Sequence, residues 1–366
     1  MKKKVDVLIL TAFFGAGHYT VSKAIKEQAL SKDDTINIEL LDLFNLVNSK
    51  FDKYLYKLYN FMTKDTPELY NFFYNMKRDY KRNYQDEIAA TIGLQKLSNY
   101  LKECEPKVII STFPVCSTVV SKFKKKYNSN IPLITCITDV VDSWEWIKEG
   151  TDKYFVPTNE IKQKLINKGV NDDIINVTGI PVRRSFLDLN ADSLNKENDL
   201  KRILIMGGGR GAFDIGMDFL YWLDSLEDTT VTVVTGTNKE LYQNLNDKNF
   251  NRIKILGFVE DVASLMTKHD LLITKPGGVT LFEAINCQTP MIVQRPKIGQ
   301  EIENANFIER SGIGIINENQ DEMKMSIEEL FHKSERIDIM KKSIFDIKKT
   351  LETSKVGDYV LEFIAN

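Results

Sequence analysis

The stretch VDVLILTAFFGAGHYTVSKAI, residues 5–25, decides the fold class. Residues 5–10 form a short, mainly apolar run, which is typical of a buried strand in a parallel sheet. Gly15 and Gly17 then break the run, and the following residues have the composition of a helix. A strand, a glycine turn and a helix in this order predict the first unit of a doubly wound α/β sheet.

The same alternation covers most of the chain and restarts once. Further strands are predicted at 36–44, 106–114, 131–139, 152–158 and 175–181 in the first half, and at 229–238, 252–258, 270–278 and 290–296 in the second. The second half opens with KRILIMGGGRGAF, residues 201–213, which again reads as strand, glycine loop and helix. We therefore expect two facing Rossmann-like domains with a ligand cleft at the carboxyl ends of their strands.

This pattern gives four segments. We expect an N-terminal domain over 1–185, a polar linker over 186–200, a C-terminal domain over 201–340, and a helical segment over 341–366 that packs back toward the N-terminal domain.

Composition excludes several classes of protein. The net charge of −2 over 366 residues gives no overall attraction to nucleic acid. The four cysteines have no CxxC spacing, and the three histidines are far apart, so neither a disulfide framework nor a structural metal site is expected. The lysine-led N-terminus resembles a signal peptide, but Asp6 and the glycine turn favour a strand. We expect a protein on the cytoplasmic side.

Two glycine loops are candidates for binding phosphate. GGGRG, residues 207–211, offers backbone amides at a helix start, although a tight turn without a ligand explains it equally well. The spacing is not GxGxxG and no acidic residue ends the next strand, which disfavours a dinucleotide and a dehydrogenase.

The second glycine loop lies in TKPGGVTLFEA, residues 274–284. Its amides and the Thr280 hydroxyl suit a diphosphate, and Glu283 suits a ribose. Thr280 and Glu283 also have the spacing of a capping box.

Gln300, Glu301 and Asn304 follow the next predicted strand at a loop-to-helix junction. Their amide and carboxylate groups offer both donors and acceptors, which sugar hydroxyls need. A solvated helix start is the alternative for these three residues.

Together these segments resemble nucleotide-sugar glycosyltransferases with two Rossmann-like domains. More narrowly, the chain resembles the family of monogalactosyldiacylglycerol synthases and processive diacylglycerol glucosyltransferases, which is related to the lipid-II-forming GlcNAc transferase. The motifs that carry the resemblance are GAGHYTVSKAI, ITDVVDSWEW, GGGRG, TGTN, LGF and, most specifically, TKPGGVTLFEAINCQTPMIVQRPKIGQEIENA.

The resemblance implies a set of donor-binding residues in the C-terminal domain and the front loop. The UDP diphosphate would lie on the amides that begin at Gly277, the ribose on Glu283, the uracil on Phe258, and the donor sugar near Gln300 and Glu301. The full implied donor set is Gly15, Gly17, Gly207, Gly208, Gly209, Gly236, Asn238, Phe258, Pro276, Gly277, Gly278, Val279, Thr280, Glu283, Gln300, Glu301 and Asn304. No metal and no cofactor beyond the UDP-sugar are expected.

His18 matches the histidine of the family's GxGH motif. Transfer with inversion needs a base for the acceptor hydroxyl, and an imidazole with a pKa near 6.5 suits this at neutral pH. A helix-cap histidine bound to backbone is the alternative. Asp139 matches the family's Thr-Asp and is expected to orient His18 or to act as the base itself. Ser143 stands where the family commonly has a histidine, which is a departure.

The acceptor side is predicted from aromatic residues. Residues 50–84 hold seven of the fourteen tyrosines among lysines and arginines, which suits an anionic membrane surface as well as a helical hairpin with packed aromatics. The acceptor and membrane residues that we expect are Phe113, Pro114, Trp144, Trp146, Tyr54, Tyr59, Tyr70 and Tyr74.

These observations predict a peripheral enzyme on the inner face of the cell membrane. It would move a hexose, expected to be glucose, from a UDP-hexose to diacylglycerol with inversion, so the N-terminal domain would face the acceptor and the C-terminal domain would bind the donor. The alternatives are transfer to a polyprenol or glycolipid, a UDP-sugar epimerase, and a non-catalytic UDP-sugar-binding protein of the same fold.

Overall fold

A computed structural model describes residues 4–13, 16–47, 84–189, 201–209 and 215–365, together with Thr66, Glu68, Asn71, Tyr74 and Asn75. For residues 84–92 and Ser334 it describes the backbone alone. The described chain contains two six-stranded sheets in which every pair of neighbouring strands is parallel. The predicted α/β class with two doubly wound units is confirmed.

The first sheet has the strand order β2-β1-β3-β4-β5-β6. Its strands are β1 (Val7–Thr11), β2 (Ile38–Asp42), β3 (Val108–Ser111), β4 (Leu133–Cys136), β5 (Lys153–Val156) and β6 (Ile175–Val177). Its helices are α1 (Gly17–Leu30), α2 (Leu43–Val47), α5 (Tyr84–Cys104), α6 (Pro114–Tyr127), α7 (Asn159–Asn167) and α15 (Val356–Ala365). Every residue of β1, β3 and β4 is buried, which explains why these segments lack the alternation of a half-exposed strand.

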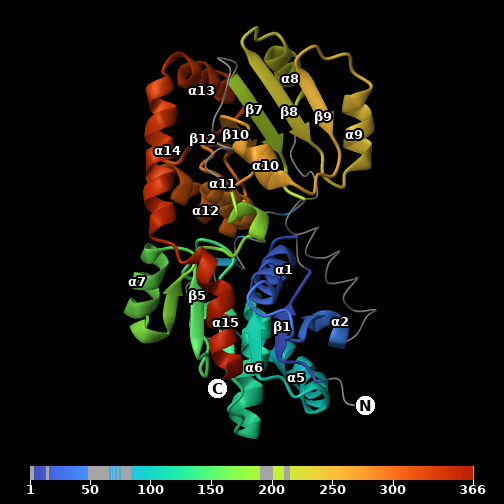
Figure 1. Cartoon of the computed structure of the whole chain (residues 1–366), viewed down its shortest axis with the longest axis vertical. Helices are drawn as coiled ribbons and strands as arrows, with labels where there is room; N and C mark the ends of the chain where they lie inside the picture. Colours follow the sequence, from blue (N-terminus) through green and yellow to red (C-terminus); the bar gives the residue numbers. More distant parts are fainter. Residues whose placement is uncertain are drawn as a thin grey trace. The chain divides into compact units, whose positions relative to one another are not determined.

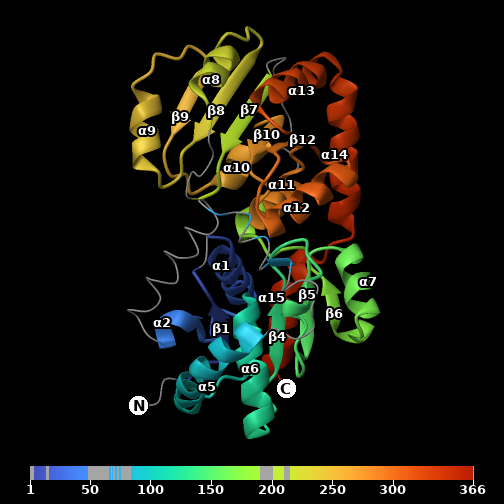
Figure 2. The ribbon, with the colours of Figure 1, turned by 180° about the vertical axis from the view of Figure 1, so that it is seen from behind.

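Helices cover both faces of this sheet. Leu97 and Leu101 of α5 and Val119 of α6 join Leu8 and Ile109 of the strands in one apolar cluster. On the other face, α1 and α15 pack against each other and on β1 and β3. Figure 1 shows α15, in red, in front of the strands, and Figure 2 shows α5 and α6 from behind.

The second sheet has the order β12-β11-β10-β7-β8-β9. Its strands are β7 (Lys201–Met206), β8 (Thr229–Val234), β9 (Ile253–Leu256), β10 (Leu271–Thr274), β11 (Met291–Gln294) and β12 (Gly314–Asn317). Its helices are α8 (Met217–Asp224), α9 (Lys239–Asn246), α10 (Val262–Thr267), α11 (Gly278–Cys287), α12 (Gly299–Arg310), α13 (Gln320–His332) and α14 (Ser334–Lys349). Side chains of α8, α13 and α14 form an apolar cluster with β7, β8 and β10.

Each predicted strand is present but shorter than its predicted run. Most runs include the turn that follows the strand, and several, such as that of β1, also begin one or two residues before the strand does. β12 was not predicted. Its four residues, GIIN, include only two large apolar residues between a glycine and an asparagine, yet they complete the edge of the sheet beside β11.

By contacts, the chain forms two compact units. One contains Met1–Arg184, Ile298–Gln300 and Leu351–Asn366, and the other contains Ser185–Lys297 and Glu301–Thr350. The last residues of the chain thus belong with the first unit. In the described part of the chain, no helix has the length and apolarity needed to cross a membrane.

Candidate functional site

His18 is the second residue of α1, the helix that follows β1. Its Nδ1 lies 2.9 Å from the carbonyl oxygen of Thr112 and 2.9 Å from Oγ1 of Thr138. A carbonyl oxygen only accepts, so Nδ1 carries the proton and donates it to Thr112. In the neutral ring this leaves Nε2 with a lone pair, as a base requires.

The surroundings of the ring keep it neutral. Its imidazole packs edge-on against Phe113, with the ring centroids 5.0 Å apart. Desolvation by burial lowers the pKa of His18 from 6.5 to about 4, against the opposing effect of the hydrogen bond to Thr112. The residue as a whole keeps some exposure to solvent. The expectation of a pKa near 6.5 is therefore corrected: the ring is neutral at pH 7, but is a weaker base.

A chain of hydrogen-bonded hydroxyl groups holds the His18 backbone in place. Oγ1 of Thr112 donates to Oγ1 of Thr11 at 2.9 Å and lies 2.9 Å from Oγ of Ser22. Ser22 in turn donates to the carbonyl oxygen of His18 itself. These bonds fix the carboxyl ends of β1 and β3 to the first turn of α1, so the position of Nε2 is set by backbone as well as by packing.

Of the alternative of a helix-cap histidine bound to backbone, the bond to backbone is present and the capping role is not. The N-cap residue of α1 is Ala16, and no side chain caps the helix. His18 instead binds the carbonyl of a residue 94 positions away. Gly17 is the first residue of the helix, and Gly15 lies outside the described residues.

Thr112 and Thr138 were not singled out from the sequence. Each immediately precedes a residue that was, Phe113 or Asp139, and each follows a buried strand. Both threonines could have been predicted from one sequence pattern, a hydroxyl residue at the carboxyl end of each of two neighbouring strands. Asp139 is next to Thr138, but the two contacts of Nδ1 go to the threonines.

The aromatic acceptor residues fall into different environments. Phe113 is the N-cap of α6 and partly exposed, and Pro114 is the buried first residue of that helix. Trp146 is only 3% exposed, so its ring is part of the core. Ser143 is fully buried, and its Oγ accepts from the amide of Glu145 at the start of a single 3-10 turn. Ser143 thus caps the start of this turn.

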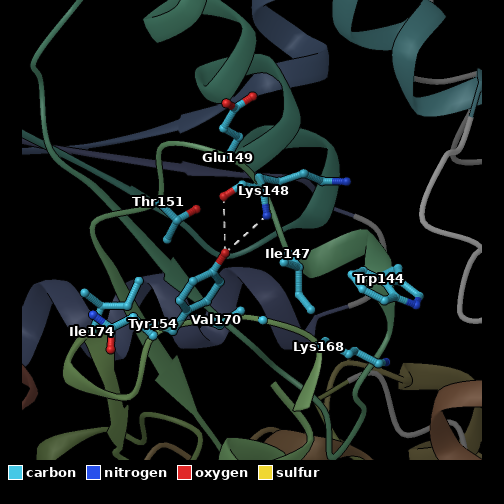
Figure 3. A pocket seen from close by; sticks show the side chains of 11 residues that line it. Trp144, Ile147, Lys148, Glu149, Thr151, Tyr154, Lys168, Val170 and Ile174 are labelled. Atoms are coloured by element: carbon cyan, nitrogen blue, oxygen red, sulfur yellow. Dashed lines mark hydrogen bonds between the residues drawn. The ribbon is translucent and has the colours of Figure 1, made fainter. Parts of the chain in front are cut away.

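Trp144 borders a cavity of about 450 Å³ within the first unit, shown in Figure 3. Lys168 lies over the Trp144 ring, 5.3 Å from its centroid, and pairs with Asp142 at 2.9 Å. Most of the lining comes from residues that lead into β5 and β6. Thr112 and Thr138 instead follow β3 and β4, so most of this lining lies at the amino ends of the parallel strands and His18 lies at their carboxyl ends.

Most of the tyrosine-rich segment lies outside the described residues, including Tyr54, Tyr59 and Tyr70. Tyr74 is described and is 7% exposed. At this position the ring is packed rather than presented to solvent, as the hairpin alternative predicts.

In the second unit, the strongest candidate is the start of α11. The strand β10 ends at Thr274, and the helix begins at Gly278 with Gly277 as its N-cap. No side chain caps this helix, so its first amides are open to an anion. The capping-box alternative for Thr280 and Glu283 is wrong, because Thr280 is the third helical residue and not the N-cap.

The side chains around this helix start have distinct contacts. Glu283 is 7% exposed on α11. Asn304 is fully buried, and its Nδ2 donates to the carbonyl oxygen of Pro276 at 3.0 Å, so it holds the glycine loop by its backbone. Glu301, one turn before Asn304 on α12, forms an ion pair with Lys275 at 3.0 Å. Gln300 and Val279 are partly exposed.

The loop after β7 is packed against the loop after β8. Gly208 and Gly236 both have positive φ, 70° and 57°, where a side chain is disfavoured. A Cβ on Gly236 would lie 2.6 Å from the carbonyl oxygen of Gly209, which also accepts from the amide of Thr237. Gly207, the first residue of that loop, is buried.

Two further predicted residues lie beyond these loops. Asn238 caps α9, its Oδ1 accepting from the amide of Leu241 at 3.0 Å. Phe258 follows β9 and is 66% exposed, which is unusual for an aromatic ring and is available to a planar base.

Comparison with known proteins agrees with this division of the chain. A family model described as monogalactosyldiacylglycerol (MGDG) synthase matches residues 18–182, and the glycosyltransferase family 28 C-terminal domain matches residues 202–356. The chain is 33% identical to the processive diacylglycerol beta-glucosyltransferase of Bacillus cereus (strain AH187), over 99% of this chain and 94% of that protein. The protein of the same name from Bacillus licheniformis is 32% identical with the same coverage.

Solved structures resemble the chain in fold. MurG of Acinetobacter baumannii has a TM-score of 0.62 at 15% identity, covering 98% of this chain and 99% of that one. UDP-GlcNAc 2-epimerase of Neisseria meningitidis, bound to UDP-GlcNAc, has a TM-score of 0.60 at 15% identity, covering 99% and 100%. At this identity both show the fold alone, so the epimerase likeness does not extend to the reaction.

Proposed function

Because the chain belongs to the family of processive diacylglycerol beta-glucosyltransferases, we propose that it transfers glucose from UDP-glucose to diacylglycerol with inversion at the anomeric carbon. The observation that supports a catalytic site most directly is His18, whose Nδ1 is committed to Thr112 and whose Nε2 is left as a base.

The proposed step at His18 is a proton transfer coupled to displacement. Nε2 accepts the proton of the acceptor hydroxyl, whose oxygen forms a bond to the anomeric carbon of glucose. The bond from that carbon to the diphosphate oxygen breaks, and its electron pair leaves with UDP. Attack opposite the leaving group gives a β-linked glycolipid. Thr112 and Thr138 hold the ring in the required tautomer.

On the donor side we assign the diphosphate to the open amides at Gly278 and Val279 and to the Thr280 hydroxyl. Glu283 is assigned to the ribose diol, and exposed Phe258 to the uracil ring. Glu301 and Gln300 are assigned to the glucose. Asn304 supports the loop through Pro276 instead of contacting the sugar through that amide group.

On the acceptor side, Phe113 is the residue we assign to the lipid, because its ring packs on His18 and is partly exposed. Burial removes Trp146 and Tyr74 from the proposed lipid contacts. We propose that the protein binds peripherally to an anionic membrane surface on its inner face, where a diacylglycerol acceptor and a cytoplasmic UDP-sugar are both available.

The proposal is tested by incubating the purified full chain with labelled UDP-glucose or UDP-galactose. Vesicles with and without diacylglycerol, each containing anionic lipid, are added, and the organic phase is separated. We expect label in the lipid fraction from UDP-glucose when diacylglycerol is present. Label transferred without diacylglycerol would instead indicate another lipid acceptor, and an epimerised UDP-sugar or an absence of turnover would contradict the proposal.

A further inference from the structure

Lys275 occupies a place between the two glycine loops of the second unit. It follows the last residue of β10, and β10 is hydrogen-bonded to β7, which leads into Gly207–Gly209. A Cβ placed on Gly208 would lie 3.9 Å from Cε of Lys275. The lysine stem therefore runs along one glycine loop while its backbone belongs to the other.

The ammonium group is held in this place by a carboxylate. Nζ of Lys275 lies 3.0 Å from Oε1 of Glu301, in the first turn of α12. The Lys275 side chain is 40% exposed and that of Glu301 is 17% exposed. A Lys ammonium has three donors, and a single carboxylate oxygen takes one of them. The pair thus presents a positioned cation without using all of its hydrogen-bonding capacity.

Both glycine loops have room beside their backbone. Among the residues that the structure describes, no atom lies within 4 Å of a Cβ placed on Gly209 or on Gly277. The start of α11 contributes only a partial positive charge, about half an elementary charge, whereas a departing nucleoside diphosphate carries two or more negative charges. The Lys275 ammonium, although paired with Glu301, adds a charged donor where negative charge develops on the leaving group.

We propose that Lys275 binds the diphosphate of the UDP-sugar and stabilises the UDP leaving group, with Glu301 positioning its ammonium between the two loops. This inference rests on the proposed function, and it adds a charged contact to a site otherwise built from backbone amides and a hydroxyl.

The test compares the affinity of the full chain for UDP and for uridine by calorimetry. Lys275→Met should weaken UDP binding about 10- to 100-fold and leave uridine affinity within about twofold, because uridine lacks the diphosphate. Lys275→Arg, which keeps the charge, should restore most of the UDP affinity. The matched control is Lys324→Met, which removes a lysine paired with Asp321 on α13 and should leave both affinities unchanged.

Two results would overturn the inference: equal UDP affinity in Lys275→Met and the unmodified protein, or equal losses for UDP and uridine. Both results are distinct from failure of the proposed function. If the proposed function is wrong, the unmodified protein itself does not bind UDP or does not transfer glucose to lipid.

Discussion

At the scale of single residues, His18 takes its properties from different parts of the chain. The Thr112 carbonyl, at the end of β3, selects the tautomer, and Thr138, beyond β4, adds a second oxygen at 2.9 Å from Nδ1. The Phe113 ring excludes water on one side. A ring that is neutral over the whole physiological range can accept the proton of the acceptor hydroxyl and then releases it to solvent before the next turnover, at the cost of lower basicity.

The lowered pKa of His18 has a consequence for stability. In the folded state the pKa is about 4, and in the unfolded chain it is near 6.5, so between these values the unfolded state binds more protons. The contribution is fully present above pH 6.5 and is lost as the pH falls toward 4. Lowering the pH from 7.5 to 5 should therefore cost about 2 kcal/mol through this residue.

Urea unfolding at both pH values measures this effect. His18→Gln, whose amide can still donate to Thr112, serves as the reference without a titrating ring. The unmodified protein should lose about 2 kcal/mol more than the variant between pH 7.5 and 5. Equal losses in the two proteins would show that His18 titrates normally in the folded state.

The sequence identified His18 but not the contacts that define its chemistry. A histidine after a glycine turn is visible in one segment, whereas Thr112 lies 94 positions away and contributes through its backbone, which no side-chain pattern reveals. The burial that lowers the pKa depends on how α6 places Phe113. For this reason the sequence correctly singled out His18 but predicted its pKa wrongly.

At the scale of elements, each candidate residue is placed by the end of a parallel strand. Thr112, Thr138 and Lys275 all follow buried strands. The helices after Thr112 and Lys275 have no capping side chain, whereas Ser143 caps the 3-10 turn after Thr138. These strand ends were readable from the sequence because the apolar runs end abruptly. The start of α11 was also predicted, and only its N-cap was left open, since the spacing of Thr280 and Glu283 resembles a capping box whereas the backbone shows that Gly277 is the N-cap.

Gly277→Ala tests whether the open start of α11 binds the diphosphate. Gly277 has φ −76° and ψ 137°, which alanine adopts freely, and its Cβ would meet no atom within 4 Å. The free energy of unfolding should stay the same or rise by up to about 1 kcal/mol. UDP affinity should fall at least about tenfold, because the methyl group occupies the space beside the amides.

Uridine binding is the internal control for this variant and should change little. If Gly277→Ala binds UDP as tightly as the unmodified protein, the diphosphate does not lie on these amides.

At the scale of the whole molecule, the last segment of the chain completes the first unit. Residues 351–366 group with it, although residues 201–297 and 301–350 of the other unit precede them. Gly357 of α15 lies against α1 so closely that a Cβ would be 2.6 Å from the backbone oxygen of Gln28. The helical character of this segment was predictable from its apolar pattern, whereas its close approach to α1 depends on one glycine.

Gly357→Leu should therefore destabilise the first unit by about 1–3 kcal/mol, since the side chain forces α15 away from α1. Asp358→Asn is the matched control at the next position. It breaks an exposed ion pair with Lys32 and should cost less than about 1 kcal/mol. Urea unfolding measures both, with UDP affinity as the readout of the second unit. Equal stability of the two variants would mean that the contact between α15 and α1 contributes little.

The most direct test of the whole account is single-turnover transfer from labelled UDP-glucose to diacylglycerol in vesicles by His18→Gln, with UDP affinity measured on the same preparation. The account predicts that transfer falls by about 10²- to 10⁴-fold while UDP affinity stays within about twofold, because the base is lost and the donor site is not. Transfer at the rate of the unmodified protein would contradict the assignment of His18 as the base.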